Sequence, residues 1–307
     1  MKKEHLIVEE IDRGKRLDKV LADRYKGIYS RTYFQSLIEE KKVFLNRVHA
    51  KKRIFPEVGD QIAFTLPPPQ ATDLIPEAIP LDILYEDEHI VAVNKPAGMV
   101  VHPALGNWSG TFANALVHYC NQISEVGDDA LRPGIVHRLD KETSGVIVAA
   151  KTKHAHARLI QAFSDRTIKK EYLAVCLGNP GYGVIDKPIG RHQTLRRQMD
   201  IRESGGKEAV TRFETLAFDD PLSYVSLFPK TGRTHQLRIH MKNRGTPILG
   251  DSLYGKVSSN HKYGAERQML HAYKLTIVHP VTNKTHTFVA PIPDDISRYK
   301  AMIEGRL

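Results

Sequence analysis

Residues 137–146 combine side-chain types that could carry acid–base or nucleophilic chemistry. The run His-Arg-Leu-Asp-Lys-Glu-Thr-Ser-Gly-Val places one carboxylate, Asp140, between cations on a short polar segment. The apolar run 146–150 that follows has the composition of a strand buried on both faces. Rigid scaffolds usually place chemistry on loops held by such strands. A solvated turn without function has similar composition, so the motif needs support from the rest of the chain.

Three motifs together resemble those of the RluA-type pseudouridine synthases, which convert uridine in RNA to its C-glycoside isomer. The first is the run just described. The second, Lys-Glu-Tyr-Leu-Ala-Val at 170–175, is similar to the family motif whose tyrosine packs on the target base. The third, at 231–240, is similar to the motif that supplies a basic partner for the catalytic aspartate. With weaker matches at 94–98 and 248–251, the resemblance runs from about Leu81 to near Pro291.

The resemblance implies three catalytic residues: Asp140 as the reacting carboxylate, Tyr172 as an aromatic face for the uracil ring, and Arg233 as the cation that keeps Asp140 ionised. A buried carboxylate needs such a compensating charge. The alternative for Arg233 is a phosphate-binding arginine. Outside its motif, a tyrosine in a strand, such as Tyr172, is more often a core residue.

The resemblance also implies substrate-binding residues. Arg138 resembles the residue that occupies the space left by the flipped base, and contact with an RNA phosphate is an equal alternative. Leu237 is expected to close the floor of the pocket. The other expected substrate-binding residues are His137, Thr234 and Gln236.

The implied reaction requires no cofactor and no metal. The N1–C1′ bond of uridine breaks, the base rotates and C5 joins C1′, so nothing is oxidised and no phosphate moves. The target nucleotide must first leave its stack, at a cost of a few kcal/mol. Asp140 could then attack the sugar, attack the base, or remove a proton in a glycal route, and the sequence leaves all three open.

Other chemistries fit the sequence less well. His235 and His240 are five residues apart and His154 and His156 two apart, without an acidic or cysteine ligand at a recognised spacing, so we expect no metal site. The run His-Arg-Leu-Asp superficially resembles the catalytic loop of a kinase. A kinase would also require a glycine-rich loop before a strand lysine and a DFG motif, and this sequence has neither. A glycoside hydrolase needs two facing carboxylates, whereas this motif offers one, with Glu142 two residues away.

Composition agrees with an RNA-binding enzyme. The chain has 307 residues, 41% of them hydrophobic, which suits one large domain with a smaller companion. Its formal charge of +10 favours a polyanionic partner. Cys120 and Cys176 are expected to be buried in a reducing cytosol. Without a recognisable signal peptide or membrane span, we expect a cytoplasmic and monomeric enzyme.

Residues 1–66 form a separate basic block, with fifteen Lys and Arg against ten Asp and Glu, a net charge of +5. Helical spacing of apolar residues predicts one helix around Leu17 and a second, capped by Ser30, that contains Phe34. Short strands are expected at 43–46 and 60–64. The order resembles the small RNA-binding module named after ribosomal protein S-four. This sequence departs from the module at two turns. Lys41 or Lys42 stands where the turn after the second helix usually has glycine, and Asn46-Arg47 stands where the module usually has Asn-Gly.

We therefore expect an S-four-like domain over 1–66, a proline-rich linker over 67–80 and a catalytic domain over 81–307. Strands dominate the catalytic domain, and no repeating βαβ unit is evident, which favours an α+β fold with a mostly antiparallel sheet. Strands are expected at 83–85, 89–93, 146–150, 168–177, 209–217, 224–228, 273–278 and 286–290, and a helix after Thr152. The resemblance implies the pseudouridine synthase fold, with a central catalytic cleft.

The leading hypothesis is an RNA pseudouridine synthase acting on large-subunit ribosomal RNA. A basic N-terminal module fits the branch of the family that modifies this RNA. There are two alternatives. One is a pseudouridine synthase of the same family that acts on transfer RNA, and the other is a non-catalytic RNA-binding or ribosome-assembly factor. Intact Asp140, Tyr172 and Arg233 argue against the non-catalytic factor.

Overall fold

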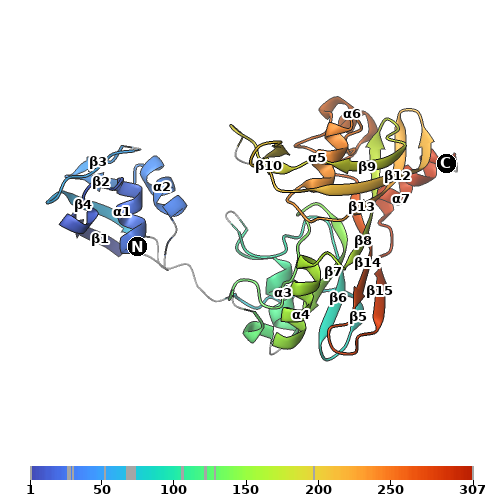
Figure 1. The fold of residues 1–307 in the computed structure, drawn as a ribbon, viewed down its shortest axis with the longest axis horizontal. Coiled ribbons are helices and arrows are strands. Elements are labelled where there is room, and N and C mark those ends of the chain that lie inside the picture. The colour runs from blue at the N-terminus through green and yellow to red at the C-terminus, as the bar shows by residue number, and fades with distance from the viewer. Residues whose placement is uncertain are drawn as a thin grey trace. The chain divides into compact units, whose positions relative to one another are not determined.

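The computed structural model describes residues 2–25, 29, 31–51, 53–66, 74–104, 107–120, 123–127, 129–195 and 198–305. The chain divides into two compact units, residues 1–72 and 73–307 (Figure 1). The expected cap Ser30 and positions 67–73 of the expected linker lie outside the described residues. Every helix within the described ranges is too short or too polar to cross a lipid bilayer.

The first unit is a four-stranded antiparallel sheet with two α-helices. Its strands are β1 (Lys2–Ile7), β2 (Val43–Leu45), β3 (Val48–His49) and β4 (Gln61–Leu66), in the order β1-β4-β2-β3. Its helices are α1 (Leu17–Arg24) and α2 (Arg31–Glu39), with a short 3-10 helix (Glu10–Asp12) before them. The apolar positions that predicted the helices form the core of this unit, namely Leu17, Val20, Leu21, Phe34, Leu37 and Ile38.

The positions where glycine was expected adopt backbone conformations that usually favour glycine. Lys41 has φ 57°, and Asn46 and Arg47 have φ 50° and 67°. Asn46 and Arg47 form the two-residue connection between β2 and β3, where positive φ at both central residues matches the twist of the strands. The sequence departures therefore leave these tight turns in place.

The second unit is an α+β domain built on a nine-stranded sheet, as the sequence predicted. The strands are β5 (Asp82–Glu86), β6 (Ile90–Lys95), β7 (Ser144–Ala150), β8 (Lys169–Leu177), β9 (Tyr182–Asp186), β12 (Val210–Asp219), β13 (Leu222–Pro229), β14 (Leu270–Val278) and β15 (Thr285–Val289). Their order is β5-β6-β7-β14-β8-β13-β12-β9, with β15 paired to β14. All pairings among these described strands are antiparallel except β7 with β14.

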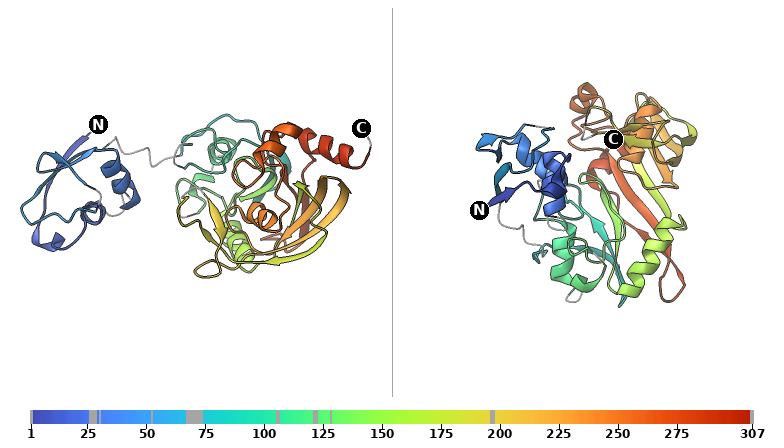
Figure 2. Two further views of the ribbon diagram at one scale, coloured as in Figure 1. Left: turned by 90° about the horizontal axis from the view of Figure 1, so that it is seen from above. Right: turned by 60° about the vertical axis from the view of Figure 1, so that its left-hand side comes forward.

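Helices cover both faces of this sheet (Figures 1 and 2). They are α3 (Phe112–Tyr119), α4 (Lys153–Ser164), α5 (Gln236–Asn243), α6 (Val257–Tyr263) and α7 (Asp294–Ile303). The unit also contains a 3-10 turn (Ile123–Glu125) and a small two-stranded ribbon of β10 (Ile189–Arg191) and β11 (Met199–Ile201). Successive side chains of β8 point to opposite faces, so Leu173 and Val175 pack with α7, whereas Ala174 and Cys176 pack with α5.

The helix predicted after Thr152 is confirmed as α4, and Thr152 caps it by accepting a hydrogen bond from Ala155 N. Cys120 and Cys176 are buried and not disulfide-bonded, as expected. The described part of the expected linker, 74–80, is anchored to the second unit. The Asn114 side chain of α3 donates to the Ile75 carbonyl at 2.8 Å. This segment of the expected linker therefore has a hydrogen-bonding partner on α3.

The parallel pairing of β7 with β14 fixes the loop that precedes β7. Gly145 lies opposite Ala272 in this pairing and has φ 112°. A Cβ at Gly145 would lie 2.2 Å from the Ala272 carbonyl oxygen, so only glycine permits this approach. The glycine of the first motif therefore lets the two central strands meet directly beside the loop that carries Asp140.

Candidate active site

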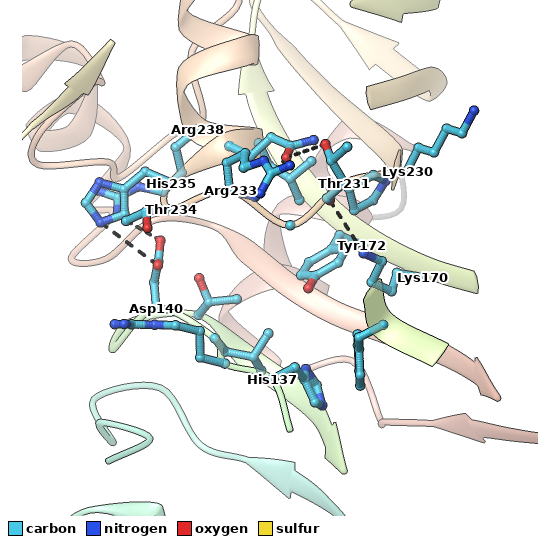
Figure 3. Close-up of a pocket in the computed structure, with 18 of the residues that line it drawn as sticks. His137, Asp140, Lys170, Tyr172, Lys230, Thr231, Arg233, Thr234, His235 and Arg238 are labelled. Carbon is cyan, nitrogen blue, oxygen red and sulfur yellow. Dashed lines mark hydrogen bonds and ion pairs between the residues drawn. The ribbon is translucent and has the colours of Figure 1, made fainter. Parts of the chain in front are cut away.

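The three motifs converge on one cavity of about 610 Å³ (Figure 3). The first motif lies before β7, the second begins on β8, and the third connects β13 to α5. All eight residues expected from the sequence line this cavity: His137, Arg138, Asp140, Tyr172, Arg233, Thr234, Gln236 and Leu237.

Hydrogen bonds hold the backbone of the turn that carries Asp140. Thr143 N donates to the Asp140 carbonyl at 3.1 Å. The carbonyl of Lys141 accepts from Gly98 N at 2.9 Å and from the Lys95 ammonium at 3.1 Å. Because these bonds come from several elements, the turn has a defined position relative to the sheet.

Two buried cations supply much of this support. Lys95 is fully buried, its ammonium also donates to the carbonyls of Pro96 and Met99, and burial lowers its pKa to about 7. Arg267 donates from Nη1 to the Glu142 carbonyl at 3.0 Å. The same guanidinium is held by two hydrogen bonds, at 2.7 and 2.9 Å, to Asp295 at the start of α7. The C-terminal helix is thereby linked to the catalytic turn.

The Asp140 carboxylate faces the cavity and binds Arg238. Arg238 Nη1 donates to Asp140 Oδ2 at 3.0 Å, and the Asp140 side chain remains 20% exposed. His235 Nε2 lies 3.9 Å from the other carboxylate oxygen (Figure 3). Asp140 therefore has one strong charge-assisted contact and a carboxylate oxygen that remains accessible from the cavity.

Arg238 is fixed by a second carboxylate, Asp251. Arg238 Nε and Nη2 donate to Asp251 at 2.7 and 2.9 Å, and Asp251 also accepts from Leu253 N and Tyr254 N. Burial alone would lower the pKa of Arg238, but the hydrogen bonds and charges of Asp251 and Asp140 raise it. A Cβ at Gly250 would lie 1.7 Å from the Arg267 carbonyl oxygen, so glycine is required beside Asp251.

The expected ion pair between Arg233 and Asp140 is replaced by the pair between Arg238 and Asp140. Arg233 lies in the loop before α5, and its Nε donates to the Glu208 carbonyl at 2.9 Å. Glu208 itself pairs with Arg166 at 2.7 Å. Arg238 is in the first turn of α5, whose inward face turns it toward Asp140. Both arginines belong to the third motif, so their order in the sequence did not distinguish them.

His235 is a site residue that sequence reasoning considered only as a metal ligand. It precedes α5 in a left-handed conformation, with φ 56°. Its Nδ1 lies 2.9 Å from the Tyr254 hydroxyl. Burial lowers the pKa of His235, against the opposing effect of the Asp140 charge. Tyr254 therefore orients the imidazole beside the carboxylate.

Tyr172 provides the aromatic wall of the cavity (Figure 3). Burial and the nearby Asp140 charge raise the pKa of its hydroxyl, so it remains a neutral phenol. An aromatic face next to a carboxylate suits a flat base that reacts at its edge or at the attached sugar.

The remaining expected residues differ in how they face the cavity. Arg138 and Thr234 are exposed at the cavity, and Leu237 is buried in its wall. His137 accepts a hydrogen bond from Val148 N and stacks on Phe163 with ring centroids 4.6 Å apart; burial lowers its pKa to about 3.

Gln236 supports the loop from inside the protein. Its amide oxygen accepts hydrogen bonds from the Thr231 hydroxyl and Arg233 N. Its amide nitrogen donates to the Val210 carbonyl and to the Thr211 hydroxyl, so both ends of the amide are occupied. Gln236 therefore braces the 231–235 loop from inside the protein. Within the described part of the chain, no group of three or more His, Cys, Asp or Glu side chains could hold a metal ion.

Known proteins are similar in sequence to this chain over most of its length. The family model described as RNA pseudouridylate synthase matches residues 89–243. A Neisseria meningitidis protein named ribosomal large subunit pseudouridine synthase D is 42% identical over 92% of this chain and 77% of its own length. An Escherichia coli protein of the same name is 39% identical, over 94% and 90%.

A solved structure supports the fold assignment. Human RNA pseudouridylate synthase domain containing 1 is 30% identical, with a TM-score of 0.57, over 70% of this chain and 84% of its own. The resemblance of the three motifs, the fold class and the enzyme class expected from the sequence are confirmed. The chain belongs to the RNA pseudouridine synthase family.

Proposed function

We propose that this enzyme isomerises specific uridines of large-subunit ribosomal RNA to pseudouridine. The names of its relatives in Neisseria meningitidis and Escherichia coli refer to that subunit, and the similarity extends over most of this chain. The basic first unit offers a further surface for a large RNA. We also propose that the enzyme works in the cytoplasm as a monomer, without a metal or cofactor.

The observation that carries the catalytic proposal is the Asp140 carboxylate, held by Arg238 beside Tyr172 in one cavity. The target uridine would leave its stack and lay its base against Tyr172. Asp140 would act on the nucleotide as nucleophile or as base. Arg238 would keep the carboxylate ionised and oriented, because a paired guanidinium favours the charged form.

The rim of the cavity supports contacts to the RNA backbone. Arg138, Lys230 and Arg233 line it, and their charges suit phosphates on either side of an extruded nucleotide. Arg138 remains a proposed occupant of the space left by the base, with phosphate contact as its alternative. Residues 1–66 are proposed to be an S-four-like RNA-binding domain, in keeping with the antiparallel sheet and two helices of the first unit.

The experiment that tests the substrate is a chemical map of pseudouridine in ribosomal and transfer RNA from cells with and without this gene. We expect one or more large-subunit sites to lose pseudouridine in the deletion strain and to regain it with the wild-type gene. Complementation with Asp140→Asn should fail, which ties the loss to catalysis. Sites lost only from transfer RNA would replace the ribosomal substrate with the same-family alternative.

A non-catalytic RNA-binding or ribosome-assembly role is the second candidate. The geometry around Asp140 disfavours it, because a binding protein has no need of a carboxylate that is both paired and accessible. A deletion strain with unchanged pseudouridine but altered ribosome assembly would support that role.

A further inference from the structure

The cavity contains a cation that the roles above leave unused. Lys170 lines it two residues before Tyr172 on β8, so both side chains point to the same face of the sheet. The intervening Glu171 points to the other face, where it accepts from Lys274 at 3.0 Å and from Ser226 at 2.9 Å. Strand geometry therefore directs Lys170 and Tyr172 together into the cavity (Figure 3).

Lys170 lacks a carboxylate partner among the described residues. Its ammonium donates only weakly, to the Thr231 carbonyl at 3.4 Å. Burial, and then the charge of Arg166, lower the pKa of Lys170 to about 8. An ammonium taken from water without a compensating charge costs free energy, which marks it as a candidate for function.

The charged neighbours make an anion the natural partner of this ammonium. Arg166 follows α4, Lys230 and Arg233 lie on the loop before α5, and the first motif contributes His137 and Asp140. Arg166 is already paired with Glu208, and Asp140 with Arg238. Among the described residues of the cavity, Lys170 is the cation that lies beside Tyr172 on β8, and no carboxylate occupies it before a ligand binds.

The reaction itself generates an anion next to Tyr172. When N1–C1′ breaks, its electron pair remains on N1 and spreads over O2 and O4 of the uracil. Reattachment then forms the C5–C1′ bond, C5 loses its proton and N1 gains one. The reaction therefore needs neither an oxidant nor a reductant. A preorganised cation in a site shielded from water stabilises such developing charge more strongly than water does.

We propose that Lys170 is a catalytic residue that donates to a carbonyl oxygen of the uracil stacked on Tyr172 and stabilises the uracil anion as the glycosidic bond breaks. This inference rests on the pseudouridine synthase activity and is independent of which RNA is the substrate. A phosphate is the less suitable partner, because Arg138 and Lys230 are exposed at the cavity whereas Lys170 is half-buried.

The test compares Lys170→Met with Lys169→Met, which removes the same charge from the exposed neighbouring position of β8. We expect Lys170→Met to lower the single-turnover rate at saturating RNA by about 100-fold or more, the usual loss when one donor to a developing anion is removed. RNA affinity should change by less than about 3-fold, since one cation among many phosphate contacts contributes little. Lys169→Met should retain the wild-type rate.

Lys170→Arg provides a readout that a structural role would not change. The wild-type rate should fall above about pH 8 as the Lys170 ammonium loses its proton. Arginine stays protonated, so Lys170→Arg should keep part of the rate and lose this alkaline decline. Thermal unfolding serves as the folding control. Lys170→Met should be at least as stable as wild type, because it replaces a half-buried charge that has no carboxylate partner among the described residues.

Two results would overturn the proposal. One is a Lys170→Met enzyme whose rate returns to the wild-type value at saturating RNA with a flatter salt dependence of binding, which would make Lys170 a phosphate contact. The other is an alkaline decline that persists unchanged in Lys170→Arg. Failure of the wild-type enzyme to modify any ribosomal RNA would instead contradict the proposed substrate.

Discussion

Arg238 lies between two carboxylates, with Nη1 3.0 Å from Asp140 Oδ2 and Nε 2.7 Å from Asp251 Oδ2. Asp251 is buried and takes two hydrogen bonds from the guanidinium, so it fixes the plane of the group. The remaining nitrogen is thereby aimed at the catalytic carboxylate. The orientation of Asp140 consequently depends on a residue, Asp251, that lines no part of the cavity.

Substitution of Arg238 should separate charge from geometry. Arg238→Ala should lower the single-turnover rate by at least about 100-fold, and Arg238→Lys should recover only part of it, because lysine cannot bind two carboxylates through a planar fork. Arg233→Ala is the matched control from the same motif. It should mainly weaken RNA binding, with saturating RNA restoring most of the rate. The reverse pattern would make Arg233 the functional partner of Asp140.

Asp251 should contribute to both stability and catalysis. Asp251→Ala leaves part of the Arg238 guanidinium buried without its partner, which typically costs about 3–5 kcal/mol of unfolding free energy. Urea unfolding measures this loss. At a temperature where the variant is folded, its rate should also fall while RNA affinity is retained. An unfolding free energy within about 1 kcal/mol of wild type would show that the pair does not hold the site together.

The link from α7 to the catalytic turn should appear as a change in kcat. Arg267→Met removes the donor to the Glu142 carbonyl and frees Asp295, so the turn that carries Asp140 should lose its fixed position. A displacement of about 1 Å can cost about 100-fold in rate, and we expect a loss of that order in kcat with little change in KM. Exposed Arg298 on α7 is the control position, and Arg298→Met should leave kcat unchanged.

The basic first unit should govern RNA binding more than chemistry. Removal of residues 1–72 should weaken RNA affinity and flatten its salt dependence, since each lost phosphate contact lowers the slope of log affinity against log salt by about 0.7–0.9. The second unit has its own hydrophobic core, and its thermal unfolding checks that it remains folded. An unchanged slope together with unchanged modification sites would show that residues 1–66 are not an RNA-binding domain.

Much of the fold could be predicted from local sequence patterns. The continuous apolar run of β7 and the helical spacing in α1, α2 and α4 specify their structures directly. The strand β1 was missed because Lys2, Lys3 and Glu4 hide its alternation, and it is defined by pairing with β4, distant in sequence. The short strands β10 and β11 offer only three residues each, too few for a periodic signal.

The sequence predicted eight residues that line the cavity, but it missed Arg238 and His235, the two side chains that lie next to the Asp140 carboxylate. Motif order placed Asp140 and Tyr172 on the cavity, because each motif adjoins a strand whose position the sheet fixes. The partner of Asp140 depends on which face of α5 turns inward, and that is set by contacts with Asp251 and the sheet. Gly250-Asp251 belonged to a weak match in the sequence. A buried acidic residue such as Asp251 needs a cation, and this need was the signal that could have identified Arg238 as the inward-facing arginine.

The most direct test of this account is the rate of pseudouridine formation by Asp140→Asn. Asparagine preserves the size and polarity of the side chain but removes the ionisable carboxylate, so folding and RNA affinity should stay close to wild type. We expect single-turnover product formation to fall below about one per cent of wild type, because a lost nucleophile or base normally costs at least about 100-fold. A folded Asp140→Asn enzyme that binds RNA normally and retains more than that rate would contradict the central role of Asp140.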